Sequence, residues 1–274
     1  MFRERWIKIL AYTLATLGAV IVIFPFLWVL MTALKPASEI SIWPPRFLPK
    51  NMTLTNFSQI LLKENFFRYM LNSLIVSLSS MICILFTSSM AGFALAKYDF
   101  PLKGVIFTLI LATAIIPLQI YMIPLFIMIF RMGLMNTYVA MVFPMTIMTF
   151  GVFFLRQTIM SIPDELLDSA RIDGASEFWI YVRIVLYLSK SALMALGIFS
   201  FSEAWANFIW PLVIVTSKNM YTTELGLAVY QRQFYIEYGP ISAGAVVTIL
   251  PMLFVFFILR KRIVTGVVLT GMKS

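Results

Sequence analysis

The sequence predicts an all-α integral membrane protein with six transmembrane helices. Of its 274 residues, 61% are hydrophobic and only 12% are charged, and the mean hydropathy is +0.93. An ordinary soluble domain is about half apolar and about a quarter charged. A water-soluble fold of this size and composition would expose large apolar patches. We therefore expect lipid to be the solvent for much of the chain.

Six apolar segments, taken in chain order, are long enough to cross a bilayer. A helix needs about 20 apolar residues for this, at a rise of about 1.5 Å per residue. The predicted spans are 9–34, 69–96, 105–130, 138–155, 192–215 and 243–259. Several contain prolines, which are expected to kink the helices because proline lacks a backbone donor. These prolines are Pro25, Pro117, Pro124, Pro144, Pro211 and Pro251. Such breaks fit a transport path better than a simple anchor.

The distribution of basic residues predicts the orientation. Most of the 21 Lys and Arg residues lie near the two termini and in the connections after the second and fourth spans. Because cytoplasmic connections carry the excess of positive charge, both termini and these connections are expected to be cytoplasmic. The net charge of +9 falls mainly beside apolar runs. This pattern indicates contact with membrane lipid rather than with nucleic acid.

The composition also limits the chemistry. Cys83 is the only cysteine, and there is no histidine. Disulfides within the chain and cysteine-built metal sites are therefore excluded, and the commonest general base is absent. We expect no catalytic residue and no metal site. A membrane-embedded enzyme is the rival reading, and it would have only carboxylates to work with.

The polar connection between the fourth and fifth spans is amphipathic and holds five of the 12 acidic residues. Its Ser-Ile-Pro-Asp sequence is a capping-box pattern, which predicts a helix that begins at Ile162. That helix is expected to stop at Asp173-Gly174, since glycine permits the left-handed backbone of a sharp turn. A second helix is predicted from about Ser176. Two short helices joined by a tight bend form a knob that fits a groove on a partner protein.

This connection resembles the EAA loop of binding-protein-dependent ABC importers. Residues 165–177 read ELLDSARIDGASE and are followed by Ile184 and Leu186 at the spacing of that loop. The core Arg-Ile-Asp-Gly-Ala-Ser is most similar to the carbohydrate-uptake branch, and the chain resembles the second permease of the maltose-transporter type. The similarity covers nearly the whole chain, including ALAKYDF at 94–100 and WANFIWPL at 205–212.

The chain departs from that family pattern at four positions. Asp168 replaces the leading glutamate and is one methylene shorter, and Ser169 replaces the first alanine. Tyr187 and Ser191 stand where prolines are expected. The last two departures leave the entry into the fifth span less defined.

The resemblance implies an ABC importer type I permease fold in a subunit that is not itself an enzyme. A second permease subunit would complete the pore, and two ATPase subunits would bind ATP and Mg²⁺. An extracytoplasmic solute-binding protein would deliver a sugar, in particular an oligosaccharide. The chain has no Gly-x-x-x-x-Gly-Lys-Ser/Thr loop, so no cofactor is expected in it. The implied location is the cell or inner membrane of a bacterium or archaeon.

The resemblance also assigns the contact with the ATPase to this loop. Asp168 would pair with a basic group on the ATPase, Ala170 would keep the helix narrow, and Gly174 would make the bend. The whole predicted coupling set is Glu165, Asp168, Ala170, Asp173, Gly174, Ile184 and Leu186. The alternative is a loop that only lies on the membrane surface.

A sugar path needs aromatic faces and hydrogen-bonding groups within the spans. The candidates are Asn72, Ser73, Gln119, Tyr121, Glu203, Trp205, Asn207 and Trp210. The same polar groups are equally suited to holding helices together. Two functional alternatives stay open: a permease of the same family for a solute such as a glycerol phosphate, and a channel or secondary transporter. The second is disfavoured because no inverted repeat is visible.

These expectations divide the chain into three parts. Residues 1–68 are predicted to hold the first span and an external segment. Residues 69–262 are predicted to form the ABC transmembrane domain, with the coupling loop at about 161–190. Residues 263–274 are predicted to be a cytoplasmic tail.

Overall fold

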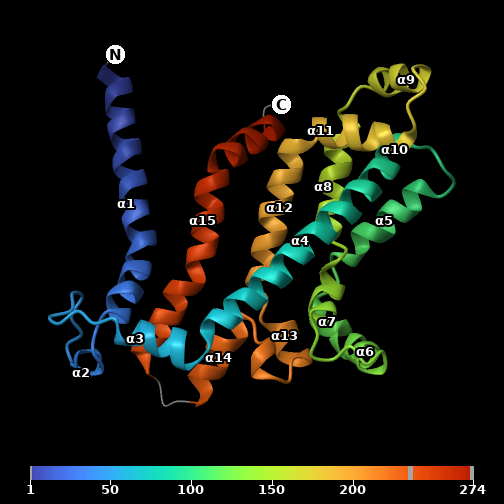
Figure 1. The fold of residues 1–274 in the computed structure, drawn as a ribbon. Coiled ribbons are helices and arrows are strands. Elements are labelled where there is room, and N and C mark those ends of the chain that lie inside the picture. The colour runs from blue at the N-terminus through green and yellow to red at the C-terminus, as the bar shows by residue number, and fades with distance from the viewer. Residues whose placement is uncertain (1, 234–236, 272–274) are drawn as a thin grey trace. The chain divides into compact units, whose positions relative to one another are not determined.

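The computed structural model describes residues 2–233 and 237–271, and every regular element in that part of the chain is a helix (Figure 1). The first elements are α1 (Phe2–Ala33), α2 (Ala37–Ile40), α3 (Thr55–Ser58), the π-helical η1 (Gln59–Lys63), α4 (Phe66–Lys97), α5 (Lys103–Thr113), α6 (Leu118–Arg131), α7 (Tyr138–Val142), the 3₁₀ turn η2 (Phe143–Met145) and α8 (Thr149–Met160). The later elements are α9 (Asp164–Ile172), α10 (Glu177–Ile180), the π-helical η3 (Tyr181–Val185), α11 (Leu186–Leu188), α12 (Lys190–Trp205), α13 (Ile209–Ile214), the 3₁₀ turn η4 (Lys218–Met220), α14 (Thr223–Gln233) and α15 (Tyr238–Gly271). The all-α fold predicted from the sequence is confirmed.

Within the described residues, three helices are long and apolar enough to cross a membrane without a break. They lie in α1, α4 and α15, over Ile7–Ala33, Phe66–Lys97 and Tyr238–Phe257. The most apolar 18-residue stretch of the span in α1 has a mean hydropathy of 2.5, and none of that stretch is buried inside the chain. Its apolar side chains therefore require lipid or another protein around them. The predicted tail begins inside α15, which continues to Gly271, and residues 272–274 lie outside the described residues.

The other three crossings are helix pairs with a sharp bend. The pair α5 and α6 bends by 97°, the segment from α7 to α8 by 51°, and the segment from α10 to α12 by 79°. With each pair counted as one span, the predicted six spans are reached. The third span was expected to be kinked and is instead broken, because Pro117 holds an extended backbone with ψ 144° before α6. The fifth predicted span, 192–215, was too long: α12 ends at Trp205 and α13 is a separate helix.

The chain forms two compact units. The first comprises residues 1–68 and 225–251, and the second comprises residues 69–224 and 252–274. In the first unit, the buried Asn56 fixes the end of α1, since its Nδ2 donates to the carbonyls of Ala33 (2.8 Å) and Lys35 (2.7 Å). Gly239 allows α15 to begin beside that amide: a Cβ there would lie 2.6 Å from Asn56 Oδ1.

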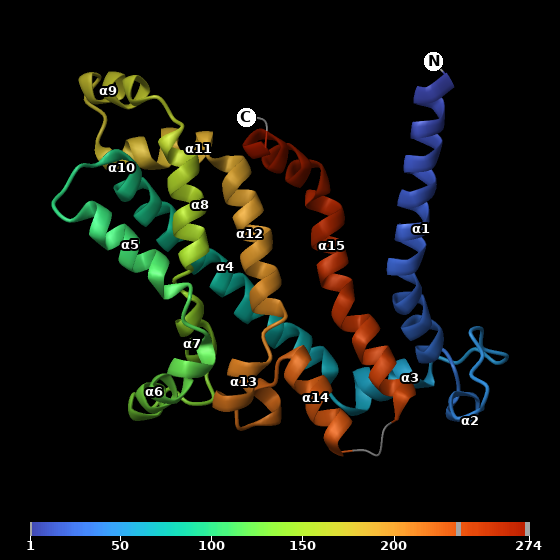
Figure 2. The ribbon, with the colours of Figure 1, turned by 180° about the vertical axis from the view of Figure 1, so that it is seen from behind.

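The second unit has an apolar core that fixes the polar connection after α8. The core cluster joins α4, α8, α9, α10, η3 and α12 through Ile84, Phe93, Leu155, Ile159, Ile162, Leu167, Ile180, Tyr181, Val185, Ala192 and Leu196. Because α9 and η3 both contribute to this core, the connection packs on the spans instead of lying free. Both views show α9 and α10 at the end of α8 that is opposite to α6 and α13 (Figure 1, Figure 2).

Candidate functional site

The first helix of the connection, α9, begins two residues later than the sequence predicted. Ser161 was expected to cap it, but its Oγ donates to the carbonyl of Thr158 at 2.7 Å and so completes the end of α8. Pro163, with extended backbone, precedes the first helical residue, Asp164, and no side chain caps that end of the helix. The prediction of a capping box was therefore wrong, because the preceding helix uses the serine.

The bend between α9 and α10 lies where it was predicted. Gly174 has φ +84°, which is favourable only for glycine. The amide of Gly174 donates to the carbonyl of Arg171 (3.0 Å), and the amide of Ala175 donates to that of Ala170 (2.9 Å). These two bonds close the end of the helix in the manner of a glycine C-cap. Ser176 then caps α10, since its Oγ accepts from the amide of Trp179 at 3.3 Å.

Arg171 connects the two short helices. Its Nη1 donates to Oδ1 of Asp168 at 2.7 Å, and its Nε donates to Oε1 of Glu177 at 2.7 Å. The hydroxyl of Tyr98, which follows α4, donates to Oε2 of the same Glu177. The hydrogen bonds from Arg171 and Tyr98 lower the pKa of Glu177, while burial and the bond to Glu177 raise the pKa of Tyr98 to about 12. At neutral pH the charged carboxylate and the neutral phenol therefore stay bonded.

A second contact joins the start of α9 to the end of α4. Nζ of Lys97 lies 2.6 Å from Oδ1 of Asp164 and also donates to the carbonyl of Ile162. The lysine side chain is only 4% exposed, whereas the aspartate is 73% exposed. The hydrogen bond from Lys97 lowers the pKa of Asp164. The start of α9 and the start of α10 are thus each fixed to the end of α4, by Lys97 and by Tyr98.

An open groove of about 750 Å³ lies along this helix pair. Its walls are formed by Leu166, Ser169, Ala170, Asp173, Gly174, Ala175, Ser176, Trp179 and Ile184. Ala170, Asp173, Gly174 and Ile184, all from the predicted coupling set, line the groove. Glu165 and Asp168 lie on α9 and Leu186 lies on α11, all outside its lining. A knob with an apolar groove and a carboxylate on its rim is suited to contact another protein.

A cavity of about 690 Å³ lies among the spans of the second unit, at the places where three helices are broken. It is bordered by the break before α6 (Ala114, Ile116), the break before α8 (Ile147, Met148) and the break between α12 and α13 (Ala206, Asn207, Phe208). The last of these is separate from the bend within α10–α12. Irregular backbone at membrane depth is stable only where protein or a water-filled cavity satisfies its polar groups. The cavity lies where these breaks occur, and its mostly apolar lining also includes polar side chains such as Thr113, Ser200 and Asn207.

Four of the predicted path residues line this cavity: Tyr121, Glu203, Asn207 and Trp210. Trp210 is also a packing residue, because it is 1% exposed and its Nε1 donates to the carbonyl of Ala140 at 2.8 Å. Aromatic rings of Phe150 and Phe208 add to the lining, which includes no lysine or arginine. Glu203 is the only acidic side chain in that lining.

The other predicted path residues lie outside the cavity lining. Gln119 is exposed on α6, and Trp205 is buried and stacks on Phe201 at 5.8 Å. Asn72 is fully buried: its Nδ2 donates to the carbonyls of Asn219 and Tyr221, and its Oδ1 accepts from Tyr138, all within 2.8 Å. In this structure Asn72 fastens α4 to the segment before α14.

Ser73, the neighbour of Asn72, has a similar role. Its Oγ accepts from the amide of Thr223 at 2.8 Å and lies 2.9 Å from the hydroxyl of the same threonine. Ser73 is 2% exposed and Thr223 is fully buried. The pair therefore joins α4 to the start of α14 and presents no group to the cavity.

Sequence reasoning did not identify Arg171, Lys97 or Tyr98 as site residues. The spacing of Asp168 and Arg171, three apart on one helix, is a signal that predicts their ion pair. The bonds of Tyr98 and Lys97 to the loop join residues 79 and 67 positions apart. No local sequence pattern predicts contacts between residues so far apart in the chain. Within the described residues, no group of three His, Cys, Asp or Glu side chains is placed to hold a metal ion.

Six spans of which three are bent or broken, with a cavity inside the second unit and a braced helix pair at one end of that unit, define a multi-pass membrane transport component. The chain belongs to the family described as "binding-protein-dependent transport system inner membrane component", whose model matches residues 84–268.

Several relatives with similar sequences are named as permease proteins of sugar uptake systems. The arabinooligosaccharides transport system permease protein AraQ of Halalkalibacterium halodurans is 35% identical over 93% of both chains. The diacetylchitobiose uptake system permease protein NgcG of Streptomyces coelicolor is 32% identical over 96% of this chain and 88% of its own. A crystal structure of a bacterial ABC transporter for import of the acidic polysaccharide alginate has a chain with a TM-score of 0.81 and 18% identity, covering 94% of this chain and 96% of that one. The last similarity shows the fold alone.

Proposed function

We propose that this chain is one permease subunit of an ATP-driven, binding-protein-dependent importer of a neutral oligosaccharide. The observation that carries this proposal is the convergence of three helix breaks on one cavity with an aromatic lining. A solute that crosses a membrane needs a polar path through the spans, and broken helices provide it. Rings such as Tyr121 and Phe150 offer faces for the C–H surfaces of a sugar, and Asn207 and Glu203 offer hydrogen-bonding groups for its hydroxyls.

The charge of the cavity favours a neutral sugar over an anionic solute. A more distant relative, 27% identical over 96% of both chains, is the sn-glycerol-3-phosphate transport system permease protein UgpE of Escherichia coli. A phosphate is normally bound by Arg, Lys or helix N-termini. The cavity lining includes Glu203 and no basic side chain, so it offers a phosphate ester no cationic partner. The names of AraQ and NgcG agree with a neutral oligosaccharide.

The braced helix pair is proposed as the contact for the ATPase. Asp168 is bonded to Arg171 through Oδ1 yet remains 62% exposed, so a basic group of a partner can reach it. Ala170 and Gly174 line the groove and keep it open because neither has a long side chain. Since Leu167 is 1% exposed in the core, a push on α9 is passed to α8 and α12. A second permease and two ATPase subunits that bind ATP and Mg²⁺ complete the proposed assembly.

The proposed orientation places this helix pair and both termini in the cytoplasm. The excess of Lys and Arg near the termini and in this connection supports it. The extracytoplasmic solute-binding protein then docks at the opposite end of the second unit, near α6 and α13. A solved relative of the fold, with a TM-score of 0.62, is a bacterial alginate ABC transporter in complex with a pentasaccharide-bound periplasmic protein.

The test is transport by the reconstituted assembly with its binding protein. ATP-dependent uptake of labelled arabinooligosaccharide is expected, and sn-glycerol 3-phosphate is expected not to be taken up. Glu203→Gln is expected to change uptake of the sugar, while Glu224→Gln, which alters a carboxylate outside the cavity lining, leaves it unchanged. Equal uptake of the phosphate ester would overturn the neutral-sugar assignment. Uptake by the purified chain without ATP would favour a channel or secondary transporter.

A further inference from the structure

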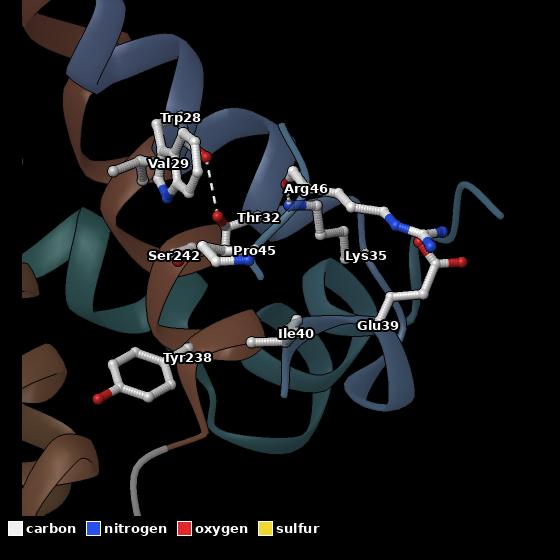
Figure 3. A pocket seen from close by; sticks show the side chains of 10 residues that line it. All are labelled: Trp28, Val29, Thr32, Lys35, Glu39, Ile40, Pro45, Arg46, Tyr238 and Ser242. Carbon is white, nitrogen blue, oxygen red and sulfur yellow. Dashed lines mark hydrogen bonds between the residues drawn. The ribbon is translucent and has the colours of Figure 1, made fainter. Parts of the chain in front are cut away.

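The first unit contains a cavity that the proposed transport function does not use. It has a volume of about 320 Å³ and lies at the end of α1, beside α2 and the start of α15 (Figure 3). Its lining residues are Trp28, Val29, Thr32, Lys35, Glu39, Ile40, Pro45, Arg46, Tyr238 and Ser242. The cavity thus combines two basic side chains with aromatic rings and hydroxyl groups.

Lys35 is the unusual member of this lining. It is only 5% exposed, and no ion pair in the described part of the chain includes it. Its Nζ donates to the carbonyl of Arg46 and lies 5.4 Å from the centroid of the Trp28 ring. An ammonium has three donors, and burial of a cation without a counter-ion is unfavourable. One carbonyl and one ring face offset part of that cost, and an anion in the cavity would offset the rest.

The surroundings hold Lys35 in place in the absence of any ligand. Asn56 Nδ2 donates to the Lys35 carbonyl at 2.7 Å, and the amide of Thr53 donates to the carbonyl of Leu34 at 2.9 Å. Phe47 stacks on Phe24 at 5.6 Å, which anchors the segment after Arg46 on α1. These contacts fix the backbone of Lys35, and the carbonyl of Arg46 holds its ammonium, so the site is organised before binding.

The remaining charges leave the cavity net positive. Glu39 is the only carboxylate in the lining, and its two oxygens accept from the backbone amides of Lys50 (2.8 Å) and Asn51 (3.0 Å). Together with the nearby Arg46, these bonds lower its pKa, the bond from Lys50 being the main cause. The negative charge of Glu39 thus offsets the positive charge of the nearby Arg46, and the positive charge of Lys35 has no counter-charge in the lining.

The location indicates what kind of anion is available. The membrane-spanning part of α1 ends at Ala33, two residues before Lys35. The segment that follows exposes large apolar side chains, including Trp43 (87%), Met52 (70%) and Leu54 (69%). Exposed tryptophan and aliphatic side chains at the end of a span are typical of the headgroup layer of a bilayer. We propose that this cavity binds the phosphate group of an anionic phospholipid, with Lys35 as its main ligand.

Native mass spectrometry of the purified assembly in nanodiscs tests the proposal. Discs contain phosphatidylcholine with or without phosphatidylglycerol, and the lipids retained after release are counted. We expect one phosphatidylglycerol per copy of this chain to be lost with Lys35→Met. Lys50→Met removes an exposed lysine from the same segment and is expected to lose none. The assignment would be overturned if Lys35→Met and Lys50→Met retained equal amounts of phosphatidylglycerol. It would also be overturned if the chain retained phosphatidylcholine as well as phosphatidylglycerol.

A second pair of variants leaves Lys35 in place, in case its loss prevents assembly. Ser242→Asp adds a negative charge to the cavity lining, and Ser242→Asn has nearly the same shape without the charge. The aspartate variant is expected to lose the bound lipid and the asparagine variant to keep it; identical behaviour would contradict the proposal. Inorganic phosphate at millimolar concentration distinguishes the sources: displacement of the lipid would mean that free phosphate is the preferred ligand. Sugar uptake reports on the transport function separately.

Discussion

Arg171 Nε lies 2.7 Å from Oε1 of Glu177, across the bend that Gly174 makes between α9 and α10. The same guanidinium is bonded to Asp168, so one side chain holds the angle between the two short helices. Tyr98 fixes the other oxygen of Glu177 from the end of α4. The helix pair is therefore a braced unit, and its bracing residues can be removed one at a time.

Replacing Arg171 is expected to loosen the helix pair without unfolding the spans. Its side chain is 34% exposed, and partly exposed ion pairs contribute roughly 0.5 kcal/mol each. Arg171→Gln should increase amide hydrogen exchange over α9 and α10 and reduce transport per ATP hydrolysed several-fold. Arg183→Gln removes an equal charge from an exposed position in the same connection and serves as the control. Identical exchange in the two variants would show that Arg171 is not a brace.

Gly174→Ala is expected to cost about 1 kcal/mol from backbone conformation alone. Its φ is +84°, and an added Cβ would meet no atom of the surrounding residues within 4 Å. The cost therefore comes only from the local backbone and not from a clash with other parts of the chain. Gly133→Ala is a matched control: φ there is +68°, the space is also open, and the residue lies outside the helix pair. Both variants should lower thermal stability by similar amounts, but only Gly174→Ala should weaken co-purification with the ATPase. A loss of ATPase binding in both would argue against a local role of the bend.

The helix pair is expected to detach from α4 at acidic pH. The pKa values of Asp164 and Glu177 are lowered by their bonds to Lys97 and Arg171. A group whose pKa is lower in the folded state stabilises that state above its ordinary pKa, near 4, and loses this effect as the pH falls through the lowered value. Hydrogen exchange over α9 and α10, corrected for intrinsic rates, should therefore rise below about pH 4.

Variants assign this pH response to its two carboxylates. Lys97→Met removes the cause of the Asp164 shift, and Arg171→Gln removes the main cause of the Glu177 shift. Each variant should flatten part of the response, while the exchange of α12 stays constant. Constant protection of α9 down to pH 3 in the unaltered chain would contradict the prediction.

Gly151→Ala is expected to destabilise the packing of α8 against α4 by about 1–3 kcal/mol, as overpacked cores are. A Cβ at residue 151 would lie 2.4 Å from Ser88 Oγ and 3.2 Å from Leu196 Cδ2. Ser88 Oγ is buried and has no hydrogen-bond partner, so Ser88→Ala alone should be nearly neutral. The double variant should recover part of the stability, measured by thermal unfolding in detergent. Strict additivity of the two changes would refute the contact.

The fold was predictable where local signals agree with one another. The six apolar segments, the bend at Gly174 and the start of the second helix at about Ser176 are confirmed, since each depends on residues close together in the sequence. The start of α9 was predicted wrongly because Ser161 had two possible partners, and α8 took it. The break before α6 was stronger than expected, and the fifth span was shorter. The roles of the coupling set and of the path residues stay predictions.

The sequence by itself determined the solvent of this protein, the number of its spans and the place of the polar helix pair. Hydrophobic length and glycine conformation are properties of short segments, so they can be read along the chain. Only the tertiary structure decided that Lys97 and Tyr98 hold the helix pair, that Asn72 is a fastening residue, and that three helix breaks share one cavity. Those relations join residues far apart in the sequence, and they exist only once the helices have packed.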